Sequence, residues 1–445
     1  MVNSTHLQKL VTSEWNDWRI SNNIGTPDLT GADLRNLNLA NKDLTGADFS
    51  RATLLGSDLS GSILKLATFA DTALRGANLS RANLERANLT GIDFREAVLE
   101  GANMKMAILN RATLSGVNLR GAFLENARFE ATNLEGADFS GAVLRDAAFR
   151  GTGLSGAHFE SANLENVVLD NLELNKVNLR GADLSGCSLK YTKLRDADLS
   201  NAKFCRANLI NTDFAGANLT RSDFELATLI EVKFDNVNLQ MARFNNARLE
   251  KVSLSSANIR DAWFEGAKLN VSFQNMDLRV AKFPGAALSG SNLNGVVMQG
   301  MDLRGISIKN SNLIGARLAE ANIEDAVLDG SNFAGAILRQ TNLSKSSLVG
   351  AIFERADLSG ANLTAANLNK ASFYEADLRF AKLMRANLNA ANFTRSNLSS
   401  TNMTDALTQK AKFWGARTSR NSRIVCALYW RPVLIVFRLF GKKKE

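Results

Sequence analysis

The chain has 445 residues and a formal net charge of +9, and its composition is rich in Leu, Ala, Asn, Asp and Gly, with only 3 Pro, 3 Tyr and 2 His. Hydrophobic residues make up 45% of it, which argues against an intrinsically disordered protein. The cysteines, Cys187, Cys205 and Cys426, stand at unrelated spacings, which predicts neither a disulfide framework nor a paired-cysteine metal site. His6 and His158 are too few for a histidine-based catalytic triad or metal cluster, and both are expected at the surface.

Residues 1–26 are expected to form a helical N-terminal cap. Apolar side chains recur there at helical spacing, and Gly25 and Pro27 are expected to end the helix. We expect Trp15 and Trp18 to cover the first turn of the structure that follows, with partner binding as the alternative role. The segment lacks the charged and apolar regions of a secretory signal, so a cytoplasmic protein is predicted.

A five-residue repeat begins at Pro27. From Leu29 to Leu269 every fifth residue is Leu or Phe, with Met104 and Ile259 as substitutes, and a small residue, usually Ala, stands two positions before each of these centres. A period of five fits neither a helix nor a lone strand, so both positions must face inward while the chain turns at every repeat. Glycines are expected at the corners, and the Asn or Asp before each centre is expected to bond the corner backbone.

The repeat loses one residue once, which divides it into a first frame, 27–270, and a second frame, 271–420. Leu269 is followed by the next centre, Phe273, only four residues later, and the new frame continues to Phe413. We expect a local kink or a widened coil here. It is interpreted either as a functional hinge or as an irregularity of the repeat that the fold tolerates. The signs of irregularity are the large inward residues Met276, Met301 and Ile306, and Pro284 just past a centre.

Blocks such as GADLS, RANLE and RANLT resemble the A(D/N)Lxx pattern of the pentapeptide-repeat family over most of the chain. The resemblance implies an all-β solenoid, a right-handed quadrilateral β-helix with four repeats in each coil. The array would then hold about 19 or 20 coils, with a short N-terminal cap helix and a C-terminal amphipathic helix. The WNDWR stretch of the cap is similar to helical segments that precede many bacterial arrays, notably cyanobacterial ones.

The tail, residues 421–445, leaves the repeat. Its apolar stretch is shorter than the roughly 20 residues of a membrane span, and Arg431 interrupts it. On a helical wheel its basic residues gather in one sector, which is typical of a helix lying in an anionic membrane interface; a cap and self-association as a homodimer through a solenoid end are the alternatives. The charge from Arg420 onward is +6, against +3 for the other residues. The candidate membrane contacts are Arg423, Trp430, Arg431, Phe437, Arg438, Phe440 and Lys442.

Outward positions of the first frame carry more apolar residues on one face than elsewhere. We interpret this face as a protein-docking stripe, with scattered surface apolar residues as the alternative. Its candidate contacts are Phe123, Leu226 and Trp263.

The sequence contains no pattern for catalytic, cofactor-binding or metal-binding residues, so we predict no cofactor and no enzyme activity. The predicted function is a protein-interaction scaffold in the cytoplasm, with an unknown protein partner and a peripheral membrane contact. The family resemblance implies an alternative, modulation of a type II topoisomerase such as DNA gyrase by an acidic rod that imitates DNA, but this array is mildly basic. Nucleic-acid binding through the basic tail is a further alternative that we do not favour, because the tail aromatics stand among aliphatic residues.

Overall fold

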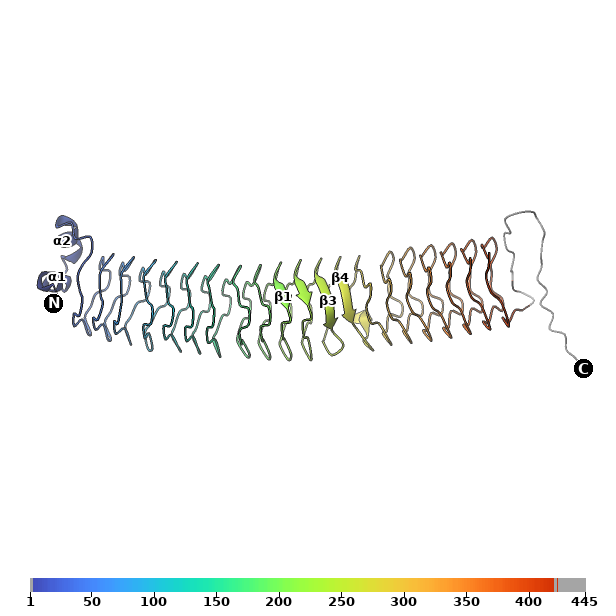
Figure 1. The fold of residues 1–445 in the computed structure, drawn as a ribbon, viewed down its shortest axis with the longest axis horizontal. Coiled ribbons are helices and arrows are strands. Elements are labelled where there is room, and N and C mark those ends of the chain that lie inside the picture. Colours follow the sequence, from blue (N-terminus) through green and yellow to red (C-terminus); the bar gives the residue numbers. More distant parts are fainter. Residues whose placement is uncertain (1–2, 420–421, 423–445) are drawn as a thin grey trace, which may run out of the picture. The chain divides into compact units, whose positions relative to one another are not determined.

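The computed structural model describes residues 3–419 and residue 422. These form two compact units, one ending at Arg243 and one beginning at Phe244. Within each unit the chain coils as a right-handed quadrilateral β-helix (Figure 1). Residues 20 positions apart form parallel bridges, as in Asp28 with Asp48 in the first unit and Asn312 with Asn332 in the second. Four repeats therefore complete each turn, as predicted.

The inward side chains form ladders along each unit. Leu29 and the small residue Ala32 are both buried, as are most of their equivalents in the following repeats. Where the centre is Phe, rings one turn apart stack, with centroids of Phe129 and Phe149 4.9 Å apart. Each stacked ring adds dispersion contact to the burial of its own surface, so stability accumulates with the number of turns.

The corners lie in the left-handed region of backbone conformation. Gly31 has φ of 68°, as predicted for a corner glycine, but Arg51 and Leu66 at equivalent corners both have φ of 60°. Such a conformation costs a residue with a side chain about 1–2 kcal/mol. The costs are offset in part by hydrogen bonds, since Arg51 N–H donates to the carbonyl one turn on and Asp48 Oδ1 accepts from Ser50 N–H at 2.9 Å. The predicted Asn and Asp bonds at the corners are thus confirmed.

The N-terminal cap contains two helices instead of the single helix expected. Helix α1 spans Ser4–Leu10 and helix α2 spans Trp15–Ser21. The interruption follows from Thr12, whose backbone N–H and side-chain hydroxyl both donate to the Lys9 carbonyl and end the first helix. The expectation of a surface His6 was wrong, because His6 is buried and its Nδ1 accepts from Asp28 N–H at 3.0 Å.

Short β-strands form where several consecutive residues are bridged to the next turn. In the first unit β1, Asn208–Ile210, pairs in parallel with β2, Thr228–Ile230. In the second unit β3, Arg248–Ser253, pairs in parallel with β4, Lys268–Ser272. The register between β3 and β4 shifts by one residue between Glu250 and Val252, so that Val252 lies opposite Val271. The lost residue predicted from the sequence is therefore accommodated as an irregularity in this ladder.

A short 3-10 helix, η1 at Leu278–Val280, follows the register shift. It takes the place of a regular corner and leaves Val280 partly exposed. Of the large residues expected to face inward nearby, Ile306 is buried, whereas Met276 and Met301 are only half-buried. The local irregularity predicted around Pro284 is thus present in the second unit.

Candidate interaction surfaces

The outward apolar residues that the sequence assigns to one face can be placed in the first unit. Bridges connect Ile63 through successive turns to Phe123 and then to Val143, so these outward residues share one column. The corner beside this column carries Leu66, Met106 and Leu226. The face assigned from repeat counting is thus a real face of this unit.

The densest group on this face surrounds Phe123. Phe123 is 43% exposed and Met106, on the preceding turn, is 48% exposed. Lys105 lies 5.5 Å from the centre of the Phe123 ring and donates to Glu125 at 2.9 Å. The second carboxylate oxygen of Glu125 is buried and has no hydrogen-bond partner among the described residues. A buried carboxylate oxygen without a hydrogen bond costs free energy. This oxygen lies beside two exposed apolar side chains.

Leu226 lies on the same face but five turns from the corner beside Phe123, roughly 24 Å away at the usual spacing of neighbouring strands. The two candidates therefore share a face without sharing a contact. Beside Leu226, the ligand atoms of Cys205, Asp223 and Glu225 lie within 4.8 Å of one another. Burial, followed by the two carboxylates, raises the pKa of the Cys205 thiol, which favours the protonated form.

Trp263, the third predicted contact, belongs to the second unit. Its ring is 37% exposed and is covered on one side by Lys282, whose Nζ lies 4.1 Å from the ring centre. Lys282 is bridged to Trp263 from the next turn. A cation held over an indole face in this way contributes about 0.5–1 kcal/mol at an exposed site.

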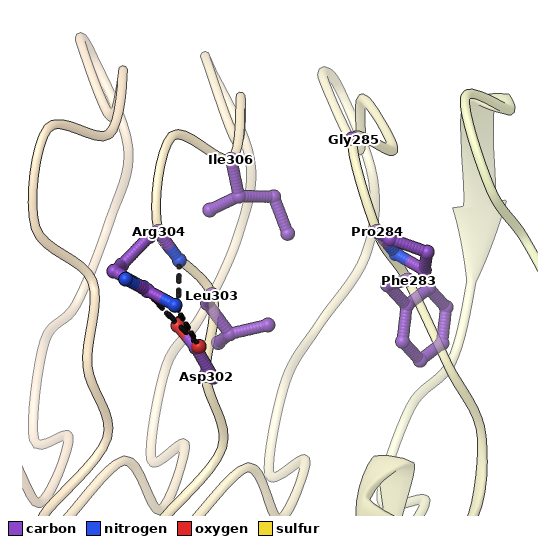
Figure 2. A pocket seen from close by; sticks show the side chains of 7 residues that line it. All are labelled: Phe283, Pro284, Gly285, Asp302, Leu303, Arg304 and Ile306. Atoms are coloured by element: carbon purple, nitrogen blue, oxygen red, sulfur yellow. Dashed lines mark hydrogen bonds and ion pairs between the residues drawn. The ribbon is translucent and has the colours of Figure 1, made fainter.

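The ladder of the second unit opens beside Lys282. Phe283 N–H and Gly285 N–H would pair with the carbonyls of Asp302 and Arg304 in a regular turn, but neither bond forms within the described residues, whereas Leu288 N–H donates to the Ser307 carbonyl at 2.7 Å. A hollow of about 300 Å³ lies here. The side chains that line it come from two turns, as Figure 2 shows, and they are Phe283, Pro284, Gly285, Asp302, Leu303, Arg304 and Ile306.

The rim of this hollow is polar and its floor is apolar. Arg304 donates to both carboxylate oxygens of Asp302, at 2.9 Å from Nε and 2.7 Å from the terminal nitrogen (Figure 2). These bonds lower the pKa of the Asp302 carboxyl below its ordinary value. Leu303 and Ile306 are buried and point toward the turn that carries Pro284. The hollow can accept a small apolar side chain, but it brings together no group for acid, base or nucleophilic chemistry.

Sequence reasoning missed the two most exposed aromatic side chains of the described residues. Trp414 is 71% exposed and Phe380 is 65% exposed, both near the C-terminal end of the second unit. Both follow a centre residue of the repeat by one or two positions, where side chains face outward, so repeat position alone could have identified them.

The predicted membrane contacts between Arg423 and Lys442 lie outside the described residues. Among residues 3–419 and 422, no helix is long and apolar enough to cross a membrane.

Comparison with known families explains the repeat. The profile described as pentapeptide repeats (8 copies) matches residues 28–65, 77–116, 107–146 and four segments between 311 and 407. The profile described as a pentapeptide repeat region matches residues 157–234 and 217–293. The chain belongs to the pentapeptide-repeat family.

Solved structures of pentapeptide-repeat proteins resemble parts of the chain. HetL, involved in heterocyst differentiation regulation in the cyanobacterium Nostoc sp. strain PCC 7120, is 29% identical, covers 56% of this chain over 93% of its own length, and has a TM-score of 0.25. A thylakoid-lumen protein of Arabidopsis thaliana is 41% identical over 24% of this chain and 71% of its own, with a TM-score of 0.17. QnrB1, a plasmid-mediated fluoroquinolone resistance protein, is 16% identical over 57% of this chain and 90% of its own, with a TM-score of 0.20. No match was found among curated proteins.

Proposed function

We propose that this pentapeptide-repeat protein is a non-enzymatic scaffold in the cytoplasm that binds another protein through the face of its first unit. The group around Phe123 carries the proposal. It joins two exposed apolar side chains, Phe123 and Met106, to the ion pair of Lys105 and Glu125, on a backbone held by bridges to both neighbouring turns. Binding sites on proteins commonly combine exposed aromatic anchors with a few placed polar groups on a rigid support.

The expected partner offers an apolar pocket for Phe123 and Met106. The repeat supports this role because each turn fixes its outward side chains by stacking, so little side-chain or backbone order has to be gained on binding. The hollow beside Pro284 offers the second unit a place for one apolar side chain, with Trp263 one turn away. We do not favour a role in which the protein binds a topoisomerase by imitating DNA. The array lacks the acidic surface that such a role needs.

Variants of outward residues test the proposal directly. A photo-crosslinking amino acid at position 123 would first identify the bound protein in extracts of the source cell. Phe123→Ser should then weaken binding of that purified protein by at least about tenfold, as expected for an aromatic anchor. Leu55→Ser is the matched control, since Leu55 is an outward apolar residue of 38% exposure on another face. Equal affinities for the native protein and both variants would rule out docking at Phe123.

Attachment to an anionic membrane through residues 421–445 is a separate proposal, supported by the basic and apolar composition of that segment. Its test is co-sedimentation with anionic vesicles after Arg431→Gln and Arg438→Gln, which should reduce binding if the tail contacts lipid.

A further inference from the structure

The direction of the ladder gives the two edges of a β-helix different chemistry. In every regular turn the N–H groups of the centre and corner residues donate to carbonyls of the following turn, as Leu398 N–H does to Arg417 at 2.7 Å. The residue before each centre bonds in the opposite sense, as Asp48 N–H does to the Pro27 carbonyl at 2.9 Å. A regular repeat therefore presents two N–H donors and one carbonyl acceptor to the following turn, so donors predominate at the edge of the last turn and acceptors at the edge of the first. Each edge calls for a complement of the opposite kind.

The last described turn shows this row of donors. The backbone N–H groups of Met403, Thr408, Phe413 and Gly415 have no acceptor among the described residues. Ser400 N–H is an instructive exception, because it donates to the hydroxyls of Ser419 and Ser422 at 3.0 and 3.1 Å. The edge thus takes oxygen acceptors where they are supplied, and the described residues supply none to the other four N–H groups.

Unpaired cations surround the same edge. Lys410, Lys412 and Arg417 are exposed and form no ion pair with any described residue. From Arg379 to Thr418 the sequence has seven basic residues and one acidic residue, Asp405. The end of the second unit therefore carries a positive electrostatic potential. Both these cations and the N–H groups without a described acceptor favour a bound anion.

The centre of this edge is apolar. Phe413 stacks on Phe393 of the preceding turn, with ring centres 5.2 Å apart, and its other face is half-exposed, as are Ala411 and Ala416. Trp414 projects beside them and approaches Arg395, with the guanidinium carbon 5.6 Å from the ring centre. An apolar centre with a Trp and a cationic rim is the arrangement that interfacial membrane proteins present to lipid.

Charge and donor chemistry select among possible occupants. A second copy of this edge would bring mostly N–H donors and three further cations, so the two edges would repel each other. The tail of this chain, residues 421–445, brings a net charge of +5, which is also of the wrong sign. A nucleic acid has the right sign, but its phosphate backbone offers little to the apolar centre formed by Phe413 and the alanines.

We propose that the C-terminal edge of the second unit, formed by residues 403–417, docks on an anionic lipid surface. Lipid phosphate oxygens accept from the free N–H groups and pair with Lys410, Lys412 and Arg417, while Trp414 and the open face of Phe413 contact the acyl boundary. This contact uses the solenoid itself and is independent of protein docking at Phe123, so either proposal can fail alone.

Co-sedimentation of the full chain with vesicles tests the lipid contact. The vesicles contain phosphatidylcholine alone or phosphatidylcholine with phosphatidylglycerol. A triple variant, Lys410→Gln, Lys412→Gln and Arg417→Gln, should bind anionic vesicles roughly 100-fold more weakly, from about fivefold for each cation. Trp414→Ser should weaken binding several-fold further, and neutral vesicles should bind neither variant nor the native protein appreciably.

A second triple variant controls for total charge. Lys309→Gln, Arg317→Gln and Lys370→Gln remove three exposed cations elsewhere in the same unit and should leave binding within about twofold of native. Equal losses in both triple variants, or a loss only after Arg431→Gln and Arg438→Gln in the tail, would overturn docking by the edge. So would a larger loss of duplex DNA binding than of vesicle binding in the first variant, or a stable dimer that the first variant abolishes.

Discussion

The two ends of this protein differ in how the backbone ladder is finished. At the N-terminal end the carbonyls of the first turn are met by donors from α2, and His6 of α1 accepts from Asp28 N–H. Trp15 Nε1 donates to the Asp43 carbonyl at 2.7 Å, and Arg19 donates to the carbonyls of Asp43 and Thr45 at 2.7 and 2.6 Å. At the C-terminal end the described residues leave N–H donors, cations and the half-exposed ring of Phe413. One end is complete in itself, and the other is complementary to an anionic surface.

The N-terminal end shows which groups satisfy the carbonyls of an exposed ladder edge. Arg19 is buried, and all five of its hydrogen bonds go to acceptors, four of them backbone carbonyls. Asn16 and the ammonium of Lys42 also join the cap and the first turn, Asn16 donating to the Asn41 carbonyl and Lys42 to the Thr12 carbonyl. At the N-terminal edge a cation, Arg19, donates to a group of carbonyls. At the C-terminal edge the proposed phosphates would accept from a group of N–H donors.

The largest expected effect is at the cap. Trp15→Ala should destabilise the first unit by about 3–5 kcal/mol, because it removes a fully buried indole and leaves the Asp43 carbonyl with one donor fewer. Trp414→Ala at the other end should change stability by no more than about 0.5 kcal/mol, since its ring is mostly exposed. Chemical denaturation of each variant, followed by far-UV circular dichroism, measures both. A similar loss in the free energy of unfolding for both variants would show that Trp414 is as buried in the native protein as Trp15.

A smaller difference is expected between two phenylalanines of one ladder. Phe393→Ala should cost about 3–5 kcal/mol, because Phe393 is stacked between Phe373 and Phe413 with ring centres 4.8 and 5.2 Å away. Phe413→Ala should cost about 1–2 kcal/mol, because only one face of its ring is packed. The same denaturation experiment compares them, and an equal cost would mean that the open face of Phe413 is covered in the native protein.

Acid should loosen the N-terminal end before the C-terminal end. Hydrogen bonds from Thr30 lower the pKa of the Asp28 carboxyl, and those from Arg35 lower the pKa of Asp33 to about 2. A lowered folded-state pKa gives stability that is present above the unfolded value near 4 and is lost as the pH falls toward 2. The equivalent positions in the last turns are Asn397 and Asn402, which do not titrate.

Pepsin cleavage between pH 4 and pH 2 provides the measurement. Early cuts should fall in the first turns of the array and later cuts near residue 400. Asp33→Asn should remove part of the pH dependence at the N-terminal end. Cleavage that begins at the C-terminal end at every pH would contradict the assignment of these carboxylates as the acid-sensitive groups.

Much of the fold follows from sequence because the period of the repeat carries it. Leu29 and its equivalents needed only a count of five to be placed in the core, and the lost residue before Phe273 was visible as a change of frame. Pro284 marked an irregularity, but the opening of the ladder beside it depends on the carbonyls of the next turn. That opening could not be read from one segment of sequence.

The site residues were less predictable, because they depend on the direction of the backbone bonds. Nothing in the sequence around Arg19 says that it faces carbonyls, and nothing around Gly415 says that its N–H is left without an acceptor. Trp414, in contrast, stands at an outward repeat position and needed no structure to be found. Phe123 was found in that way, and the ion pair between its neighbours Lys105 and Glu125 was not.

Hydrogen exchange of the full chain, with and without phosphatidylglycerol vesicles, tests the difference between the two ends most directly. Amides of Met403, Phe413 and Gly415 should exchange fast in the free protein and slow on vesicles, while those of α1 and α2 stay unchanged. Slow exchange at Phe413 and Gly415 in the free protein, or no response to the vesicles, would contradict an open edge that is completed by lipid.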